Sequence, residues 1–296
     1  SSHLAMFVAF IFLIGLGLGS LELSGSNIIS GIHEQHKGRY MNLLNAFYGI
    51  GSIITPILAG HFLNIGLSFR TIYRYSLFVI VPITVYFIVM RYPRDTAPDE
   101  AEKKIDFKDL IQIIFQKDVL LMYVVIFAYV AAEIGMATWM VEFFQQERHV
   151  SVVASSLYLS IHFAGMTIGR LLGSFFVDKA GHLKSLLIFS LLAVLCISLG
   201  IFGPPSIAIV LAFTGFCFSI IFPTATAVVS GIPAKSSGTM LGMFFACGGL
   251  GGMIGPWLIG FINDLLGLKM GMSVNILFCI IIAFSLITLL RQKHCS

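Results

Sequence analysis

Nine apolar segments follow one another along the chain and decide its fold class. Each has about 20 residues or more, the length of helix that crosses a hydrocarbon layer roughly 30 Å thick, whereas a strand of a membrane barrel needs only about ten residues. Hydrophobic residues make up 57% of the sequence and charged residues only 11%, so a water-soluble core is excluded. We therefore expect an all-α polytopic membrane protein. The segments span residues 4–32, 40–64, 71–91, 119–144, 151–176, 183–202, 205–230, 237–262 and 271–291.

The positively charged residues are distributed unequally between the loops. If the first segment begins outside, only Arg70, Arg74, Arg148 and Lys269 of the 18 Lys and Arg residues fall in outer loops. The others, among them Arg170, fall in inner loops, as the positive-inside rule requires of cytoplasmic loops. We expect an integral protein of the plasma membrane whose C-terminus is cytoplasmic and whose first residue lies outside.

The first three segments recur in the last three at an offset of 200 residues without a gap. Chance matches between apolar residues are common, but a run that keeps Gly, Pro and a terminal Arg in one register is not. Two parallel copies related by an axis along the membrane normal are the arrangement of the two six-helix halves of major facilitator transporters. The matched pairs include Gly49 and Gly249, Pro56 and Pro256, Gly60 and Gly260, and Arg91 and Arg291.

This repeat divides the chain into an incomplete half, a linker and a complete half. We expect residues 1–91 to be the last three helices of the N-terminal six-helix half and residues 119–296 to be the whole C-terminal half. Nine of twelve transmembrane helices, helices 4 to 12, are then present, and three are expected before residue 1. Residues 92–118 are the predicted cytoplasmic linker. Apolar side chains at helical spacing predict an amphipathic helix in it, formed by Phe107, Leu110, Ile111, Ile114 and Phe115.

Three ionisable side chains lie in the middle of apolar segments, where an unpaired charge costs several kcal/mol. Glu22 is a candidate proton-coupling residue, and the alternative is a carboxylic acid hydrogen-bonded between helices. Glu133 can take a proton, bind substrate hydroxyls or gate the outer half, or it can form a structural pair. His162 is a candidate substrate contact, although a lone His is more often a hydrogen-bonded packing residue.

Neutral polar side chains indicate what kind of solute the protein binds. Asn42 and Asn45 share one face of the second segment, and carboxamides both donate and accept hydrogen bonds, which suits a neutral polyhydroxy ligand. Tyr48 and Trp139 can add stacking surface to such a site. The alternatives are that the amides join helices and that Trp139 anchors the protein at the membrane interface.

Four residues are candidates for gating. Pro56 and Pro256 each remove one backbone hydrogen bond from an apolar segment, which helps two halves move past one another, although tight helix packing gives the same pattern. Arg170 and Asp178 lie eight residues apart where a segment is expected to enter the cytoplasm. Charge contacts of this pair can hold one conformation closed, or the pair can simply mark the membrane edge.

Several classes of function lack the residues they need. No nucleophile, metal-ligand cluster or phosphate-binding loop is recognisable, so we expect no enzyme activity, no cofactor and no metal, and nucleic acid is not an expected partner. The five Cys residues show no paired spacing and are interpreted as packing residues. An anion carrier should place Arg or Lys in the middle of a helix, and none is recognisable there, which favours a neutral solute.

Several stretches resemble one group of the major facilitator superfamily, the fucose-proton symporters, which include sugar permeases. GLGLGSLELSGSN is similar to helix four of that group, MNLLNAFYGIGSI to helix five and AYVAAEIGMATWMVEFF to helix seven, while GRLLGSFFVDKAGHLK is an eroded form of the loop signature of the superfamily. The resemblance implies a monomer in the lipid bilayer that works by alternating access and is driven by protons. It also implies a proton-coupling role for Glu22, a sugar-ligand role for Asn45 and a pocket or gate role for Glu133.

Two other hypotheses remain open at this point. One is a major facilitator carrier for a different small solute, such as a drug or a metabolite. The other is a membrane receptor or scaffold that does not transport. Counterflow of labelled hexoses in liposomes separates a sugar carrier from both.

Overall fold

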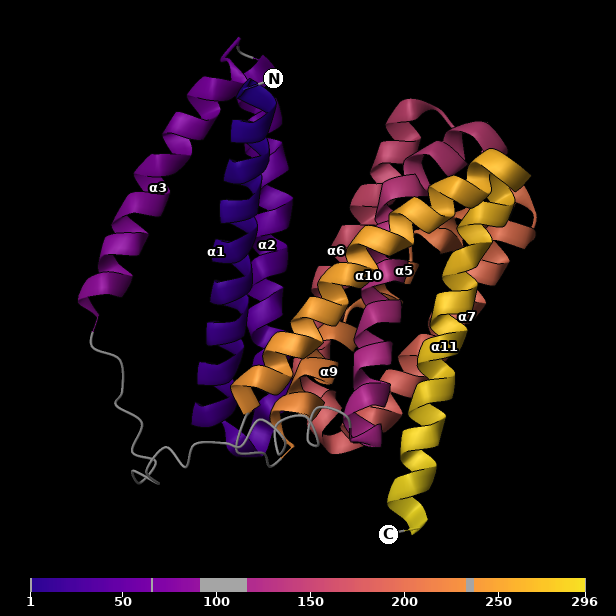
Figure 1. The fold of residues 1–296 in the computed structure, drawn as a ribbon. Coiled ribbons are helices and arrows are strands. Elements are labelled where there is room, and N and C mark those ends of the chain that lie inside the picture. The colour runs from indigo at the N-terminus through magenta and orange to yellow at the C-terminus, as the bar shows by residue number, and fades with distance from the viewer. Residues whose placement is uncertain (1, 65, 91–115, 233–236, 296) are drawn as a thin grey trace. The chain divides into compact units, whose positions relative to one another are not determined.

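The computed structural model describes residues 2–64, 66–90, 116–232 and 237–295 (Figure 1). Most of the predicted linker, including its amphipathic helix at 107–115, lies outside the described residues. All regular structure in the described part is helical, as the sequence predicts. The helices are α1 (Ser2–Ile32), η1 (Glu34–His36), α2 (Lys37–Asn64), α3 (Phe69–Val89), α5 (Lys117–Arg148), α6 (Val152–Ala180), α7 (His182–Phe202), η2 (Pro205–Leu211), α8 (Thr214–Phe218), α9 (Ile221–Ser230), α10 (Ser237–Leu266) and α11 (Leu268–Cys295).

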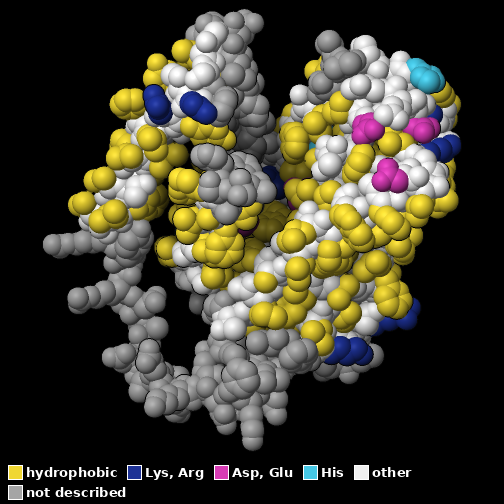
Figure 2. Space-filling view, turned by 45° about the horizontal axis from the view of Figure 1, so that its top comes forward, with side chains coloured by type: hydrophobic (Ala, Val, Ile, Leu, Met, Phe, Trp, Pro, Cys, Tyr) yellow, Lys and Arg dark blue, Asp and Glu magenta, His cyan; other side chains and the backbone are white. Residues whose placement is uncertain are grey.

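Eight helical stretches in the described residues are long and apolar enough to cross a membrane. Each coincides with one of the nine predicted segments. The remaining segment, 40–64, forms most of α2, which is helical but is not among the eight. On the face shown in Figure 2, the C-terminal helices carry hydrophobic side chains along their middle and charged side chains toward their ends, as expected of spans in a lipid bilayer.

The helices fall into two compact units. Residues 50–106, which include α3, form one unit, and residues 1–49 together with 107–296 form the other. The second unit therefore contains α1 and the first half of α2 as well as all the C-terminal helices. The predicted division at residues 91 and 119, which rests on the internal repeat, stays a prediction.

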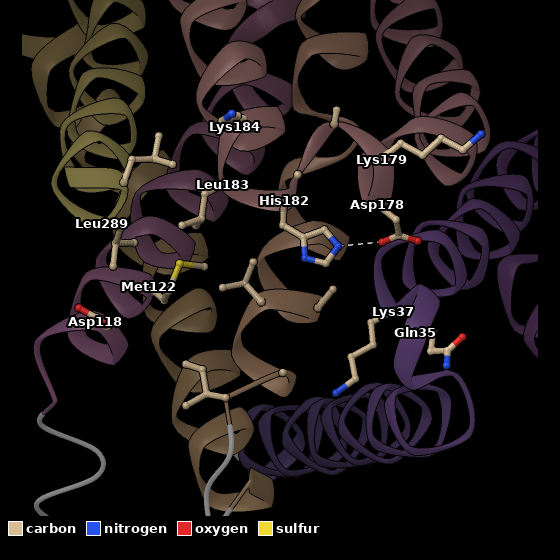
Figure 3. Close-up of a pocket in the computed structure, with 17 residues that line it drawn as sticks. Gln35, Lys37, Asp118, Met122, Asp178, Lys179, His182, Leu183, Lys184 and Leu289 are labelled. Atoms are coloured by element: carbon tan, nitrogen blue, oxygen red, sulfur yellow. Dashed lines mark hydrogen bonds and ion pairs between the residues drawn. The ribbon is translucent and has the colours of Figure 1, made fainter. Parts of the chain in front are cut away.

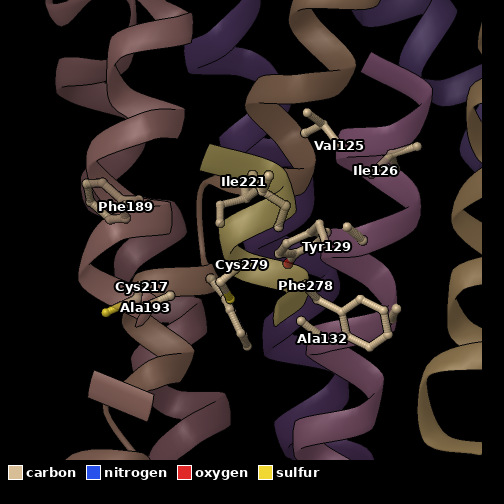
Figure 4. Close-up of a cluster of buried hydrophobic side chains, with 14 of the residues drawn as sticks. Val125, Ile126, Tyr129, Ala132, Phe189, Ala193, Cys217, Ile221, Phe278 and Cys279 are labelled. Atoms are coloured by element: carbon tan, nitrogen blue, oxygen red, sulfur yellow. The ribbon is translucent and has the colours of Figure 1, made fainter. Parts of the chain in front are cut away.

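Helix α5 forms the centre of the larger unit and packs mainly against α10 and α11. Small residues allow the close approach, because a Cβ atom on Gly251 would overlap the carbonyl oxygen of Phe127 and one on Gly255 would overlap that of Ala131. Close backbone contact through small residues is the usual way in which membrane helices associate. Buried side chains fill the remaining space between these helices, as Figure 4 shows for Tyr129.

The predicted segment 205–230 is not one continuous helix. It consists of the 3-10 helix η2, the five-residue helix α8 and the helix α9, with turns between them. A 3-10 stretch within a transmembrane segment has poorer hydrogen-bond geometry than an α-helix and often marks a hinge. Gly215 in α8 packs directly against the backbone carbonyl of His162 in α6, where no Cβ atom would fit. The break therefore lies against α6, and the turn at residues 219–220 offers a backbone carbonyl to that helix.

Candidate functional site: a buried ion pair that joins α2, α5 and α6

Glu133 of α5 and Arg170 of α6 form an ion pair inside the bundle. The Arg170 Nη2 atom lies 3.7 Å from Glu133 Oε1, and the side chains of Arg170 and Glu133 are only 6% and 16% exposed. Removing two charges from water costs more than their attraction returns unless further hydrogen bonds satisfy them. A pair at this depth is therefore expected to have additional partners or a function.

Arg170 has two further partners, both backbone carbonyls. Its Nε atom donates to the carbonyl of Ser219 over 3.3 Å, at the turn between α8 and α9. Its Nη1 atom donates to the carbonyl of Asn45 in α2, also over 3.3 Å. The carbonyl of Ser219 is free to accept this bond because residue 223, whose N–H would pair with it in an α-helix, is Pro and has no N–H. One guanidinium, which stays charged at any physiological pH, connects α2, α5 and the break before α9.

Two more polar side chains adjoin the ion pair. Glu22 of α1 interacts electrostatically with both Glu133 and Arg170, and its side chain is exposed. Tyr129, one helical turn before Glu133, is fully buried and interacts with both members of the pair. The cluster therefore consists of two carboxyl groups, one guanidinium and a phenol. With both carboxylates ionised it carries one net negative charge.

The position of Arg170 corrects two predictions. The distribution of charges predicts that Arg170 lies in an inner loop and that no membrane-spanning segment contains a cation. Both predictions are wrong, because Arg170 lies within α6 and is only 5% exposed. Arg170 and Asp178 also do not pair with each other, since the charge partner of Arg170 is Glu133. The glycines at 165, 169 and 173 fall on one face of this helix at steps of four residues and could have indicated that Arg170, beside one of them, faces another helix.

Asp178 lies at the end of α6 and binds the N-terminus of α2. Its two carboxylate oxygens accept hydrogen bonds from the backbone N–H groups of Gly38 and Arg39, each over 3.1 Å. His182 Nε2 is 2.8 Å from the same carboxylate, as Figure 3 shows, and His36 Nδ1 is 3.9 Å from it. A carboxylate at a helix N-terminus also interacts favourably with the helix dipole. Asp178 thus holds the start of α2 against α6.

Residues 37–49 of α2 contact α6 and α9, and we call this contact the α2 interface. Lys37 Nζ donates to the carbonyl of Ser230 over 3.3 Å. Asn42 is fully buried, and its Nδ2 atom donates to Thr224 Oγ1 over 3.3 Å and to a carbonyl of its own helix. The oxygen of that amide, Asn42 Oδ1, has no hydrogen-bond partner among the described residues. Asn42 therefore lies within the α2 interface.

The other predicted site residues lie in different surroundings. The side chain of Asn45 donates to a carbonyl of its own helix, and Tyr48 is 62% exposed. Trp139 is half-buried and donates through Nε1 to the carbonyl of Pro256 over 3.0 Å, which joins α5 to α10 at the predicted proline. His162 is fully buried, and its Nδ1 atom is 3.0 Å from Thr214 Oγ1 of α8.

The structure thus brings together Glu22, Glu133, Arg170 and the backbone of Asn45. Trp139 and His162 have their hydrogen-bond partners elsewhere, and Pro56 lies in α2 at a position whose side chain is not described. Ser219 and Tyr129 were not predicted. Pro223 could have indicated Ser219, because a proline leaves the carbonyl four residues before it without a helical donor, whereas an aromatic residue in an apolar run gives no such signal. No three His, Cys, Asp or Glu side chains in the described ranges are grouped so that they could hold a metal ion.

A cavity of about 720 Å³ opens beside Asp178 (Figure 3). Its polar lining includes Lys37, Asp118, His182 and Lys184, and its apolar wall comes from α5, α9 and α11. The cavity lies at the end of the α2 interface, where helices of the same unit converge. It is separate from the buried ion pair, neither member of which lines it.

Comparison with known proteins decides the family. A model of the Major Facilitator Superfamily matches residues 1–230, most of the chain. The chain belongs to this superfamily. Its fold also matches that of a fucose-proton symporter, because it superposes on a crystal structure of the Escherichia coli fucose:proton symporter FucP with a TM-score of 0.79. That superposition covers 97% of this chain and 78% of that one at 18% sequence identity, so it shows the shared fold alone.

Curated relatives are distant in sequence. "Bypass of stop codon protein 6" of Saccharomyces cerevisiae is 23% identical over 86% of this chain, and a putative glucose/galactose transporter of Helicobacter pylori is 23% identical over 88%. The chain spans 58% of the length of the yeast protein and 67% of the length of the bacterial one. The relatives thus include sugar transporters.

Gly38 provides a test of the contact between Asp178 and α2. A Cβ atom at Gly38 would crowd Asp178 Oδ1 and would lie 2.8 Å from His182 Nε2, so Gly38→Ala should push the carboxylate away from the two backbone N–H groups. Hydrogen bonds to a charged acceptor contribute about 1.5–3 kcal/mol, so we expect the amides at the start of α2 to exchange at least about tenfold faster by hydrogen–deuterium exchange.

Gly31→Ala is the matched control, because nothing lies within 4 Å of a Cβ atom at Gly31. Alanine favours a helix over glycine by about 1 kcal/mol, so helix propensity alone predicts slower exchange in both variants. Unchanged or slower exchange in Gly38→Ala would show that Asp178 does not hold α2 in place.

Proposed function

We propose that the protein is a secondary transporter that works by alternating access and carries a neutral sugar or a similar polyhydroxy solute together with protons. The observation that carries this proposal is the buried Glu133–Arg170 pair, which is bonded to α2 and to the break before α9 and lies next to a second carboxyl group. Ionisable groups inside membrane spans are costly and typically serve ion or substrate pathways.

The charge of the cluster supports proton coupling. Glu22, Glu133 and Arg170 together carry one net negative charge when both carboxylates are ionised, and a single bound proton makes the cluster neutral. The change between two closed conformations of the protein costs less electrostatic free energy when this buried cluster is neutral than when it is charged. We assign proton binding to Glu22 and Glu133, and we assign to Arg170 the role of linking their protonation to the backbone of Asn45.

The same arrangement favours a neutral solute. The buried guanidinium is already paired with Glu133 and interacts electrostatically with Glu22, so an organic anion would have to displace a carboxylate that belongs to the protein itself. Carboxamides suit hydroxyl groups because they both donate and accept, although Asn42 itself is fully buried in the α2 interface. The sugar transporter among the relatives points to the same class of solute.

A carrier for an organic anion is the second candidate, and Arg170 is the observation that favours it. A guanidinium recognises carboxylates in bidentate geometry, and Arg170 would be available to an anion if Glu133 were protonated. This candidate and the first differ in the solute, not in the fold or the membrane topology.

For both candidates we propose a monomer in the plasma membrane. Its C-terminus and the Asp178 end of α6 face the cytoplasm.

Counterflow in liposomes tests the proposed function with the protein as its gene encodes it. Vesicles are loaded with unlabelled hexose and diluted into a trace of labelled hexose, with cis-dicarboxylates as the alternative solute. We expect transient accumulation of the labelled hexose and none of the dicarboxylate. Accumulation of the dicarboxylate alone would replace the sugar by an organic anion, and accumulation of neither would remove both candidates.

A further inference from the structure

Two cysteine thiols from different helices are in contact within the C-terminal bundle. Cys217 of α8 donates its S–H to the sulfur of Cys196 in α7, with 3.8 Å between the two Sγ atoms. Figure 4 shows Cys217 beside Ala193, which lies one turn before Cys196 on α7. The other two cysteines whose side chains the structure describes, Cys247 and Cys279, are free thiols that form no hydrogen bond with another thiol.

We propose that Cys196 and Cys217 are a site of reversible oxidation, where a hydroperoxide converts the two thiols into a disulfide. A disulfide needs the sulfurs about 2.05 Å apart, so the two Sγ atoms, which are 3.8 Å apart, must approach each other by somewhat less than about 2 Å. Cys196 is half-buried and Cys217 is 5% exposed. The accessible sulfur therefore meets the oxidant, and the buried one completes the bond.

The reaction proceeds in two balanced steps. The Cys196 sulfur attacks the terminal oxygen of the hydroperoxide, the O–O bond breaks, and the thiol proton leaves with the alcohol, so that Cys196 becomes a sulfenic acid. The Cys217 sulfur then attacks the Cys196 sulfur, the S–O bond breaks, and the Cys217 proton leaves with hydroxide as water. In sum, two thiols and one hydroperoxide give a disulfide, an alcohol and water, and the two electrons pass from sulfur to the peroxide.

The existing hydrogen bond assists both steps. Reaction with a peroxide requires thiolate character, and the S–H of Cys217 stabilises negative charge on the Cys196 sulfur because it points at that atom. The same contact already places the second sulfur beside the first, so the sulfenic acid has a resolving thiol within reach. A sulfenic acid without a neighbouring thiol would instead be open to further oxidation.

The position of Cys217 gives the bridge a consequence for the buried ion pair. Helix α8 has only five residues, and two residues after Cys217 the carbonyl of Ser219 accepts the hydrogen bond from Arg170. A covalent bond from α8 to α7 would fix the break at which the chain changes from 3-10 to α-helical geometry. We infer that oxidation slows transport by restricting this break, a step that rests on the proposed function, whereas the bridge itself does not.

Mass spectrometry tests the bridge directly. The protein in lipid nanodiscs is treated with tert-butyl hydroperoxide, its free thiols are blocked with N-ethylmaleimide, and peptides are analysed without reduction. We expect a linked pair of peptides that contain residues 196 and 217, lost on addition of dithiothreitol. Cys279→Ser is the matched control and should still form the bridge, whereas Cys196→Ala and Cys217→Ala should not. Absence of the linked peptides, or a link to Cys279 instead, would overturn the proposal.

Two further measurements keep the outcomes distinguishable. Thermal unfolding of the alanine variants shows whether each still folds. Loss of the bridge is taken as evidence only in a variant whose unfolding midpoint lies within a few degrees of that of the parent. Hexose counterflow before and after oxidation should fall at least fivefold, recover with dithiothreitol and stay constant in Cys217→Ala. A bridge with unchanged counterflow would overturn the regulatory step alone. No counterflow in the reduced protein would count against the proposed function and leave the bridge standing.

Discussion

Arg170→Met is expected to lower the stability of the protein by about 3–5 kcal/mol, the cost of leaving one member of a buried ion pair without its partner. The variant keeps most of the length of the side chain but leaves Glu133 without a cation and the carbonyls of Ser219 and Asn45 without a donor. For a chain of this size we expect the midpoint of thermal unfolding in nanodiscs to fall on the order of 10 °C.

The double variant Arg170→Met with Glu133→Gln separates the ion pair from simple packing. Because it leaves no uncompensated charge, it should be more stable than Arg170→Met alone, and the interaction energy from the double-mutant cycle should be at least about 1 kcal/mol. Lys184→Met is the control, since Lys184 is exposed and forms no ion pair with another described residue. Additive effects of the two substitutions would mean that Arg170 and Glu133 do not interact in the folded protein.

Glu22→Gln is expected to abolish accumulation driven by a pH gradient while sparing counterflow. One pH unit corresponds to about 1.4 kcal/mol, so symport of one proton per solute concentrates the solute up to about tenfold. An amide has nearly the shape of a carboxylic acid but cannot release a proton, so the variant should only equalise the concentrations inside and outside. The measurement is the steady-state ratio of labelled hexose in proteoliposomes at a fixed gradient.

Glu142→Gln is the matched control for this prediction. Glu142 is also a carboxylate on a membrane-spanning helix, but it lies near the end of α5 and accepts a hydrogen bond from Gln146. It should keep the accumulation ratio of the parent. If Glu22→Gln kept that ratio as well, the proton would have to be carried by another group, and Glu133 would be the first candidate.

The general character of the protein follows from the sequence alone. Apolar segments of about 20 residues or more that follow one another along a chain form membrane helices, because only a helix satisfies its own backbone groups in lipid. The family signature around Asp178 also survives in recognisable form. Glu22 and Glu133 were recognised as candidates because a carboxylate in an apolar run carries its own signal. These predictions depend on local composition, which the sequence displays directly.

Tertiary contacts explain where the predictions were wrong. Arg170 lies near the end of an apolar run, so that counting loop charges assigns it to the cytoplasm, whereas its partners Glu133 and Asn45 lie 37 and 125 residues away in the sequence. The break in segment 205–230 was missed because its apolar composition is continuous. Pro223 could have indicated it, because proline is favoured in the first turn of a helix and Pro223 lies in the first turn of α9. Asn42 contacts Thr224 through a packing arrangement that spacing within one helix cannot reveal.

Proton movement during sugar entry is the direct test of proton-coupled sugar transport. Liposomes that contain the protein are suspended in a weakly buffered medium without a pH gradient, hexose is added outside, and the external pH is recorded. We expect the medium to become more alkaline as sugar enters, because protons enter with the sugar, and we expect Glu22→Gln to abolish this change. Sugar entry at the normal rate without any change in external pH would contradict proton coupling.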